Sequence, residues 1–275
     1  ISACLVGSEM CIRDRGKDME KILIAVDLEG VNKVVGYPYK GLIDGEEYEI
    51  AKSEAVNEIN IIVKELFKQG VKTVAVWDNH AGGDNLDFKK IDKRVIEFSR
   101  YTDNVHRAEF CKPYNFDGVI LLGYHTMEGT IGGVLAHTFN SSTIQYIKIG
   151  KKCVGEAEID SNYFSDMGVA PIMYIGDDLF IKEVKKFVKK AVFVETKKAL
   201  GRNKAEFSDE KALKRKLKSG VKKSLNTKPE TKLFTFPETV EIRFTHTDSA
   251  TEVKTALKDK FGLLASYKND AHTLT

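Results

Sequence analysis

The sequence contains little cysteine. Its 275 residues include only four cysteines, two of which, Cys4 and Cys11, lie close to the start of the chain. The other two, Cys111 and Cys153, are far from each other in the sequence. Such isolated cysteines exclude the disulfide framework of a small secreted domain. We therefore expect a reducing compartment, and most simply the cytoplasm.

The chain also lacks a strong charge of one sign and any long apolar run. Its 43 Lys and Arg residues nearly balance 40 Asp and Glu residues, and the net charge of +3 is too small to indicate a nucleic-acid partner. Lysines crowd into residues 182–232, where we expect the solvated faces of amphipathic helices. No apolar run reaches the length of a membrane span, so we expect neither a nucleic-acid nor a membrane partner.

The first 18 residues, "ISACLVGSEMCIRDRGKD", differ from the rest of the chain. They join a short apolar piece to a charged one without a convincing small-residue cleavage site, which disfavours a secretory signal. The stretch resembles translated adapter sequence. We therefore expect residues 1–18 to be a non-native or disordered leader, with the folded chain starting near Met19.

Four apolar runs have the pattern of strands buried on both faces. They are "KILIAVDLEG", "VKTVAVWDNH", "FDGVILLGYH" and "APIMYIGDD". Helical spacing follows the first run over residues 50–69, and we expect another helix, rich in charge, before the third run. Strands that alternate with helices predict a three-layer, mainly parallel, Rossmann-like α/β sheet.

Later segments complete the predicted organisation. The sequence around Gly150 and Lys151 predicts a β-hairpin, and residues 178–190 are expected to contain a helix. Residues 19–190 are assigned to the α/β domain. Residues 191–275, with the lysine-rich stretch and a late strand, are assigned to a smaller α+β C-terminal domain. The composition, 42% hydrophobic and 30% charged, suits one large and one small soluble domain.

Acids and histidines follow three of the predicted strands where each strand ends. Asp27 and Glu29 close the first, His80 the second and His125 the third. In an open parallel sheet these ends lie along one edge, where such folds bind ligands. Mixed carboxylate and imidazole ligands suit zinc, and also manganese or cobalt at a more oxygen-rich site. The pattern therefore predicts a metal site but does not fix the number of ligands.

Five motifs, in a fixed order, resemble the DppA family of D-aminopeptidases, which are metallopeptidases with a two-metal centre. They are "AVDLEGV", "EAVNEI", "VWDNHAGGDNL", "GYHTMEGTIGGVLAHTF" and "VGEAEI". The resemblance runs from about Lys21 to residues 176–178 and continues more faintly through "ALGRNKAEFS". It implies two divalent metal ions, expected to be Zn²⁺, a short peptide substrate and a homo-oligomer.

The resemblance also implies the roles of individual residues. It makes His137 the catalytic residue, placed by the glycine-rich segment 129–133 over the open face of the metals. In the hairpin sequence "KKCVGEAEI", spacing alone does not separate Glu156 from Glu158, and the family pattern selects Glu156. With five side chains for two ions, Asp27 is the natural bridging carboxylate. The metal ligands implied in this way are Asp27, Glu29, His80, His125 and Glu156.

The resulting expectation is a metal-dependent aminopeptidase. It would use metal-activated water to remove the N-terminal residue of short peptides, and the resemblance favours a D-amino acid. One alternative is a phosphohydrolase similar to haloacid dehalogenases, with Asp27 as nucleophile and Glu29 as the acid/base, although the two histidines have no role in that mechanism. Another is a non-catalytic metal-binding homologue. From Arg243 onward the chain follows the family only loosely and is expected to end before its final helix.

Overall fold

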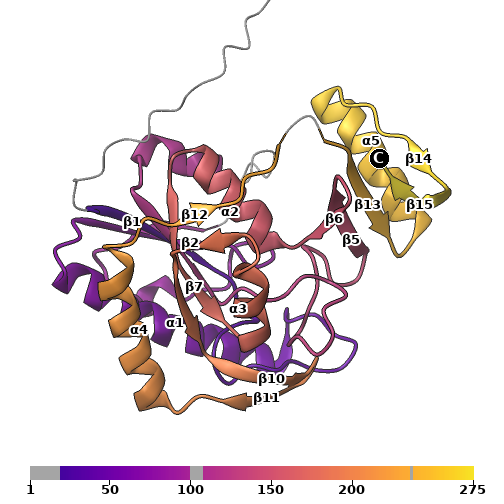
Figure 1. The fold of residues 1–275 in the computed structure, drawn as a ribbon. Coiled ribbons are helices and arrows are strands. Elements are labelled where there is room, and N and C mark those ends of the chain that lie inside the picture. The colour runs from indigo at the N-terminus through magenta and orange to yellow at the C-terminus, as the bar shows by residue number, and fades with distance from the viewer. Residues whose placement is uncertain (1–18, 100–107, 236–237) are drawn as a thin grey trace, which may run out of the picture.

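The computed structural model describes residues 19–99, 108–235 and 238–275, so the expected leader at residues 1–18 lies outside the described residues. Its centre is a six-stranded sheet with the strand order β3-β2-β1-β4-β7-β9 (Figure 1). Every neighbouring pair in this sheet is parallel, which confirms the predicted sheet type. The strands are β1 (Lys21–Val26), β2 (Thr73–Asp78), β3 (Ile96–Phe98), β4 (Gly118–Leu122), β7 (Ala170–Gly176) and β9 (Val192–Glu195).

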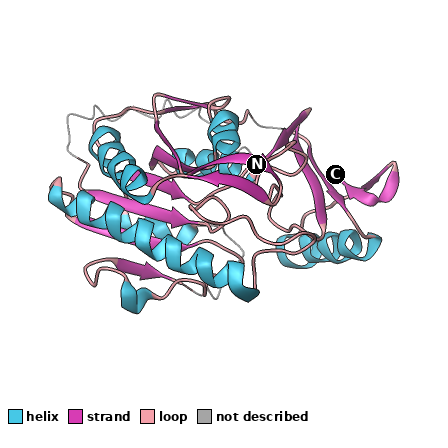
Figure 2. Ribbon diagram, turned by 90° about the horizontal axis from the view of Figure 1, so that it is seen from below, coloured by secondary structure: helices cyan, strands magenta, loops and turns pink. Residues whose placement is uncertain are grey.

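Helices cover both faces of this sheet, giving the three predicted layers (Figure 2). On one face, α1 (Gly45–Lys68) and α4 (Glu210–Ser224) share an apolar core with the alternate residues Ile22, Ile24 and Val26 of β1. On the other face, α2 (Glu156–Asp166) and α3 (Asp178–Val184) pack with Leu23 and Ala25. The sheet strands read as continuous apolar runs because side chains alternate between two buried faces.

The register of the sheet brings the ends of three strands together. Val26, the last residue of β1, pairs with Asp78 of β2 on one side and with Leu122 of β4 on the other. The loops that follow therefore leave the sheet at the same level. They also pass very close to one another: a Cβ atom added to Gly123 would lie 2.0 Å from the carbonyl oxygen of Asp27, and Gly123 has a φ of +76°. Only glycine suits this crossing.

A second, antiparallel sheet lies beside the main domain (Figure 1). The expected hairpin at Gly150 and Lys151 is confirmed as β5 (Ile144–Ile149) and β6 (Lys152–Val154), which form one edge of this sheet. The C-terminal chain supplies the other strands and a helix that packs on them. These elements are β13 (Val240–Phe244), α5 (Thr247–Phe261), β14 (Tyr267–Lys268) and β15 (Asp270–Leu274).

The structure differs from the expected domain boundary at residue 190. β9 extends the main sheet and α4 packs against α1, so residues 192–224 continue the first domain. Conversely, the smaller sheet takes residues 144–154 from the first part of the chain. The lysines of α4 concealed this, because the buried stripe that docks the helix consists only of Leu213, Leu217, Gly220, Val221 and Ser224.

Three local expectations are corrected. Among the described residues between β2 and β4 there is no α-helix, only the 3-10 turns η1 (Phe88–Lys90) and η2 (Glu109–Tyr114) and the strand β3. The helix expected over 178–190 ends at Val184, after which β8 (Val188–Lys189) pairs with β12 (Glu230–Thr231). Glu156 belongs to a helix, α2, and not to the hairpin.

Two further elements complete the described chain. β10 (Lys197–Gly201) and β11 (Lys204–Phe207) form an antiparallel hairpin directly after β9. Among the described residues, no helix combines the length and the apolar character needed to cross a bilayer.

Candidate metal centre

Asp27 lies at the middle of the polar cluster on the carboxyl edge of the main sheet. It follows β1 directly and is buried. Its Oδ1 accepts a hydrogen bond from the backbone N–H of Leu28 at 2.9 Å and lies 2.8 Å from His80 Nδ1. Its Oδ2 lies 3.4 Å from His125 Nε2. The two oxygens therefore face two different histidines, as a bridging carboxylate requires.

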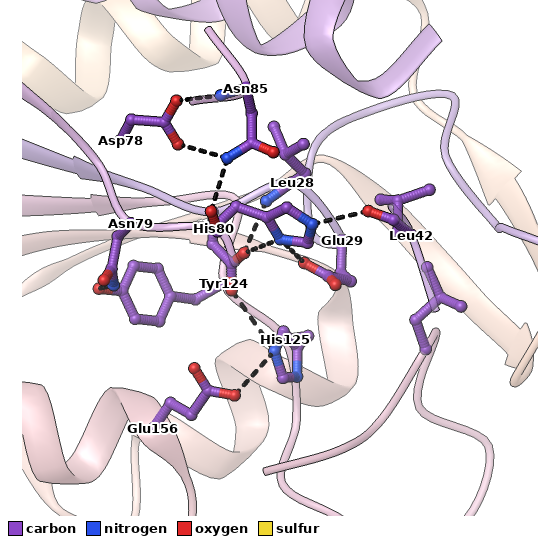
Figure 3. Close-up of polar contacts among 12 residues, drawn as sticks. Leu28, Glu29, Leu42, Asp78, Asn79, His80, Asn85, Tyr124, His125 and Glu156 are labelled. Carbon is purple, nitrogen blue, oxygen red and sulfur yellow. Dashed lines mark hydrogen bonds and ion pairs between the residues drawn. The ribbon is translucent and has the colours of Figure 1, made fainter. Parts of the chain in front are cut away.

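The first group of potential ligands comprises Asp27, Glu29 and His80, whose ligand atoms all lie within 4.8 Å of one another. His80 Nδ1 points at both carboxylates, at 2.8 Å from Asp27 and 3.2 Å from Glu29 Oε2. The other ring nitrogen, Nε2, lies 2.7 Å from the carbonyl oxygen of Leu42 (Figure 3). This carbonyl accepts the Nε2 proton and leaves Nδ1 available to a cation.

The second group comprises Asp27, His125 and Glu156. His125 Nδ1 lies 2.9 Å from the carbonyl oxygen of Thr126, and Nε2 lies 3.4 Å from Asp27 Oδ2. Nε2 also lies 3.4 Å from Glu156 Oε1 (Figure 3). His125 thus repeats the arrangement of His80 with its two nitrogens exchanged. Since Asp27 is common to both groups, the cluster suits two cations that share one carboxylate.

His137 borders this cluster and is the most exposed of the six residues, with 12% of its side chain accessible. Its ring stacks on that of His125 with 3.9 Å between centroids and 10° between planes. Nδ1 lies 2.8 Å from the carbonyl oxygen of Leu135, and Nε2 lies 3.8 Å from Glu156 Oε1. His137 also forms a third group of potential ligands with Glu29 and His125.

Opposite charges stabilise the ionised forms within the cluster. Burial by itself would raise the pKa of Asp27, but His125 and His80 outweigh burial and hold that pKa well below its usual value. Burial by itself would lower the pKa of both histidines, but Glu29 and Asp27 raise that of His80, and Asp27 and Glu156 raise that of His125. The neighbouring carboxylates thus favour the protonated imidazoles, and divalent ions would displace these protons.

Two atoms at the centre of the cluster test whether a metal fits. Glu29 Oε2 and His125 Nε2 are buried, and among the described residues they have only the ion-pair contacts at 3.2 and 3.4 Å and no hydrogen bond. Buried polar atoms are rarely left in this state, because each loses its bonds to water without replacement. Both atoms belong to the groups described above, and their nitrogen and oxygen donors are those that zinc binds. The residues present fit a zinc centre.

Neighbouring side chains hold these residues, and the sequence pattern did not reveal most of them. Asp78 accepts hydrogen bonds from the backbone N–H groups of Asn85 and Leu86, at 2.6 and 2.8 Å, and fixes the turn after His80. Asn85 also donates to the carbonyl oxygen of His80. Backbone carbonyls such as that of Leu42 leave no signal in a sequence pattern.

Helix α2 contributes a second network as well as Glu156. Asp160, one helical turn after Glu156, accepts a hydrogen bond from the Tyr124 hydroxyl at 2.7 Å, and Asn79 donates to the same hydroxyl at 2.7 Å. Glu158, which spacing could not separate from Glu156, instead pairs with Lys152 on the hairpin. Gly155 as N-cap and the apolar pair Ala157 and Phe164 were the signals of this helix.

A parallel α/β domain with carboxylates and imidazoles gathered at its carboxyl edge is typical of metal-dependent hydrolases. The family model described as D-aminopeptidase matches residues 20–258, and the chain belongs to this family.

A curated relative and a solved structure agree with this assignment. A D-aminopeptidase of Bacillus subtilis (strain 168) is 25% identical over 185 residues, which cover 66% of this chain and 65% of the relative. The match thus spans slightly less than two thirds of the relative's length. The fold is similar to that of the Zn-dependent D-aminopeptidase DppA from Bacillus subtilis, a self-compartmentalizing protease. The TM-score is 0.79 and the identity 21%, over 92% of this chain and 90% of that one.

Proposed function

We propose that this protein is a zinc-dependent aminopeptidase that removes the N-terminal residue, a D-amino acid, from short peptides. The observation that carries the proposal is the shared position of Asp27 between two groups of potential ligands. Membership of the D-aminopeptidase family supports the reaction class, and the described zinc dependence of DppA supports the metal.

Five side chains would hold the metal. In the proposal, Glu29 and His80 Nδ1 serve one ion, His125 Nε2 and Glu156 serve the other, and Asp27 serves both. When bound, the ions would polarise the scissile carbonyl and lower the pKa of water to about 7. The carbonyls of Leu42 and Thr126 keep the imidazoles oriented, since each accepts a hydrogen bond from the ring nitrogen that faces away from the cluster.

His137 would handle the proton. Its Nδ1 donates to the Leu135 carbonyl, so Nε2 is the nitrogen that faces the cluster and is free to accept a proton. A histidine outside the ligand set can take a proton from the attacking water and return it to the leaving amine. Its stacking on His125 places this function next to the second group of ligands.

The phosphohydrolase alternative is not favoured. A nucleophilic Asp27 would need one free oxygen, whereas Oδ1 is bonded to Leu28 and His80 and Oδ2 faces His125. The non-catalytic alternative is not favoured either, because the apparent ligand set is complete and His137 adjoins it.

Substitution of His137 tests the proposal. We expect His137→Ala to abolish hydrolysis of D-alanyl peptides and amides. Zinc should stay close to two equivalents per chain, because His137 belongs to neither of the two groups that share Asp27. His246→Ala is the matched control, since His246 is exposed at the start of α5. If the zinc-loaded wild-type protein cleaves neither D- nor L-aminoacyl amides, the proposal is wrong. Loss of zinc from His137→Ala would make this residue a ligand instead.

Assembly and location are part of the same proposal. We propose a homo-oligomer, because DppA is described as a self-compartmentalizing protease. Sedimentation velocity at micromolar concentration should then give a species larger than one chain of 30.8 kDa, and a monomer would contradict this. The cytoplasmic location rests on the isolated cysteines of the sequence.

A further inference from the structure

The hairpin of β10 and β11 is hydrogen-bonded to the segment that carries His137. The backbone N–H of Leu135 donates to the carbonyl oxygen of Arg202 at 2.9 Å. The Arg202 guanidinium returns the contact, because Nη1 donates to the carbonyl oxygen of Ala136. One residue at the tip of the hairpin thus bonds to two successive residues that immediately precede His137.

The segment held in this way has a strained backbone. Leu135 has a φ of +50°, in the left-handed region that bulky residues seldom occupy. Its side chain packs against Gly36, where an added Cβ would lie 2.7 Å from Leu135 Cδ2. A residue in this conformation persists only where its surroundings hold it. Arg202 provides hydrogen bonds on one side and Gly36 provides close packing on the other.

The strained residue sets the orientation of the proposed catalytic imidazole. The Leu135 carbonyl is the group that accepts the Nδ1 proton of His137, at 2.8 Å. If Leu135 relaxed to an ordinary conformation, this carbonyl would turn away, and neither the tautomer nor the ring position of His137 would be fixed. The backbone N–H of His137 is held separately, by the carbonyl of Thr126 at 3.2 Å.

We infer that Arg202 is a positioning residue for His137. This inference rests on the proposed function, in which His137 transfers the proton. An arginine is not a zinc ligand, and the effect of Arg202 passes through Leu135 and Ala136. A misplacement of about 1 Å at a reacting group lowers a rate by roughly 10²-fold, which is the size of effect that loss of the guanidinium should have.

A rival role for Arg202 is direct binding of the substrate. The residue is exposed, and a guanidinium suits the carboxylate of a short peptide. The two roles differ in kinetics. A positioning residue affects the transition state and lowers kcat, whereas a residue that binds the substrate uniformly raises KM and leaves kcat unchanged.

The experiment compares variants of the zinc-loaded, full-length protein on a D-alanyl amide and a D-alanyl dipeptide. We expect Arg202→Ala to lower kcat by roughly 10²-fold on both, with KM, zinc content and melting temperature near those of the wild type. Arg202→Lys should recover part of the rate, because an ammonium can still donate to Ala136. Lys204→Ala, which removes an exposed cation from the same hairpin, is the control and should match the wild type.

Several outcomes would overturn the inference. An unchanged kcat in Arg202→Ala, or a rise in KM confined to the dipeptide, would reject positioning and favour carboxylate binding. Failure of Arg202→Lys to exceed Arg202→Ala would reject the hydrogen bond as the cause. His137→Ala is measured in the same assay. If His137→Ala keeps the wild-type activity, the proposed function is wrong. If His137→Ala is inactive while Arg202→Ala keeps the wild-type activity, only the inference about Arg202 is wrong.

Discussion

Two buried charged clusters contact the loop that follows β1, and they differ in how their polar atoms are bonded. In the candidate metal cluster, Glu29 Oε2 and His125 Nε2 make ion-pair contacts but no hydrogen bond among the described residues. In the second cluster, the buried Lys197 donates from Nζ to the carbonyls of Glu29, Val31 and Val34 at 2.6, 2.7 and 2.6 Å. The lysine is satisfied by the chain itself.

The difference separates a structural charge from a functional one. A buried ammonium with three acceptors fixes the loop and needs no ligand. A buried carboxylate oxygen and an imidazole nitrogen that make no hydrogen bond are suited to a ligand, which would supply the missing bond. Glu29 takes part in both clusters, since its carbonyl is held by Lys197 and its carboxylate faces His80. The structural cluster therefore shapes the functional one.

Substitution of Asp27 should have the largest effect, because it removes the side chain common to two groups of potential ligands. We expect Asp27→Asn to lower peptidase activity by roughly 10³-fold or more, since the activation of water by the metal is lost. Zinc measured by mass spectrometry should fall from two equivalents per chain to one or none.

Asp259→Asn is the control for the loss of a carboxylate, as Asp259 is exposed on α5. Two tightly held zinc ions in Asp27→Asn would show that the groups do not depend on a shared oxygen, and the contrast between the clusters would then lose its basis.

Lys197→Met should produce the largest loss of stability. Three buried carbonyls would lose their hydrogen-bond donor. We expect the free energy of unfolding to fall by about 3–5 kcal/mol in protein from which a chelator has removed the metal. Urea unfolding measures this, with the exposed neighbour Lys198→Met as the control. A loss below about 1 kcal/mol, comparable to that of one ordinary hydrogen bond, would contradict the structural role of this cluster.

The sequence predicts much of the metal cluster because the cluster depends on strand ends. Asp27, His80 and His125 each follow a continuous apolar run, and a parallel sheet brings such positions to one edge. The pattern contains no comparable signal for Lys197, which stands among many exposed lysines in the same stretch of chain. Its burial depends on contacts with the loop after β1, which lies 163–168 residues earlier in the chain.

The sequence does not reveal the domain boundary, for a related reason. Local patterns identify elements but not their partners, so the short strand β9 and the lysine-rich α4 resembled a new unit. Glu156 was selected by resemblance and not by geometry. Its place in the first turn of α2 was hidden because the preceding hairpin ends only two residues earlier, at Val154.

A smaller effect, dependent on pH, is expected at Glu58 beside Lys197. Burial raises the pKa of Glu58 from 4.5 to about 7, against the opposing effects of the Asn32 N–H and Lys197. Between these two values the folded chain binds more protons than the unfolded chain, so stability falls as pH rises from about 4.5 to 7 and the loss is complete above 7. Glu58→Gln removes the charge and keeps an oxygen for Asn32, which donates at 2.9 Å.

We therefore expect the free energy of unfolding of Glu58→Gln to be close to that of the wild type near pH 5 and about 2–3 kcal/mol higher at pH 8. Urea unfolding of metal-free protein measures this difference. The exposed Glu252→Gln on α5 is the control and should show no such dependence. Glu58 Oε2 lacks a hydrogen-bond partner among the described residues, as Glu29 Oε2 does. If Glu58→Gln were no more stable than the wild type at pH 8, Glu58 would be ionised and stabilised by its surroundings. An unbonded buried oxygen would then no longer distinguish the candidate metal cluster from the cluster around Lys197.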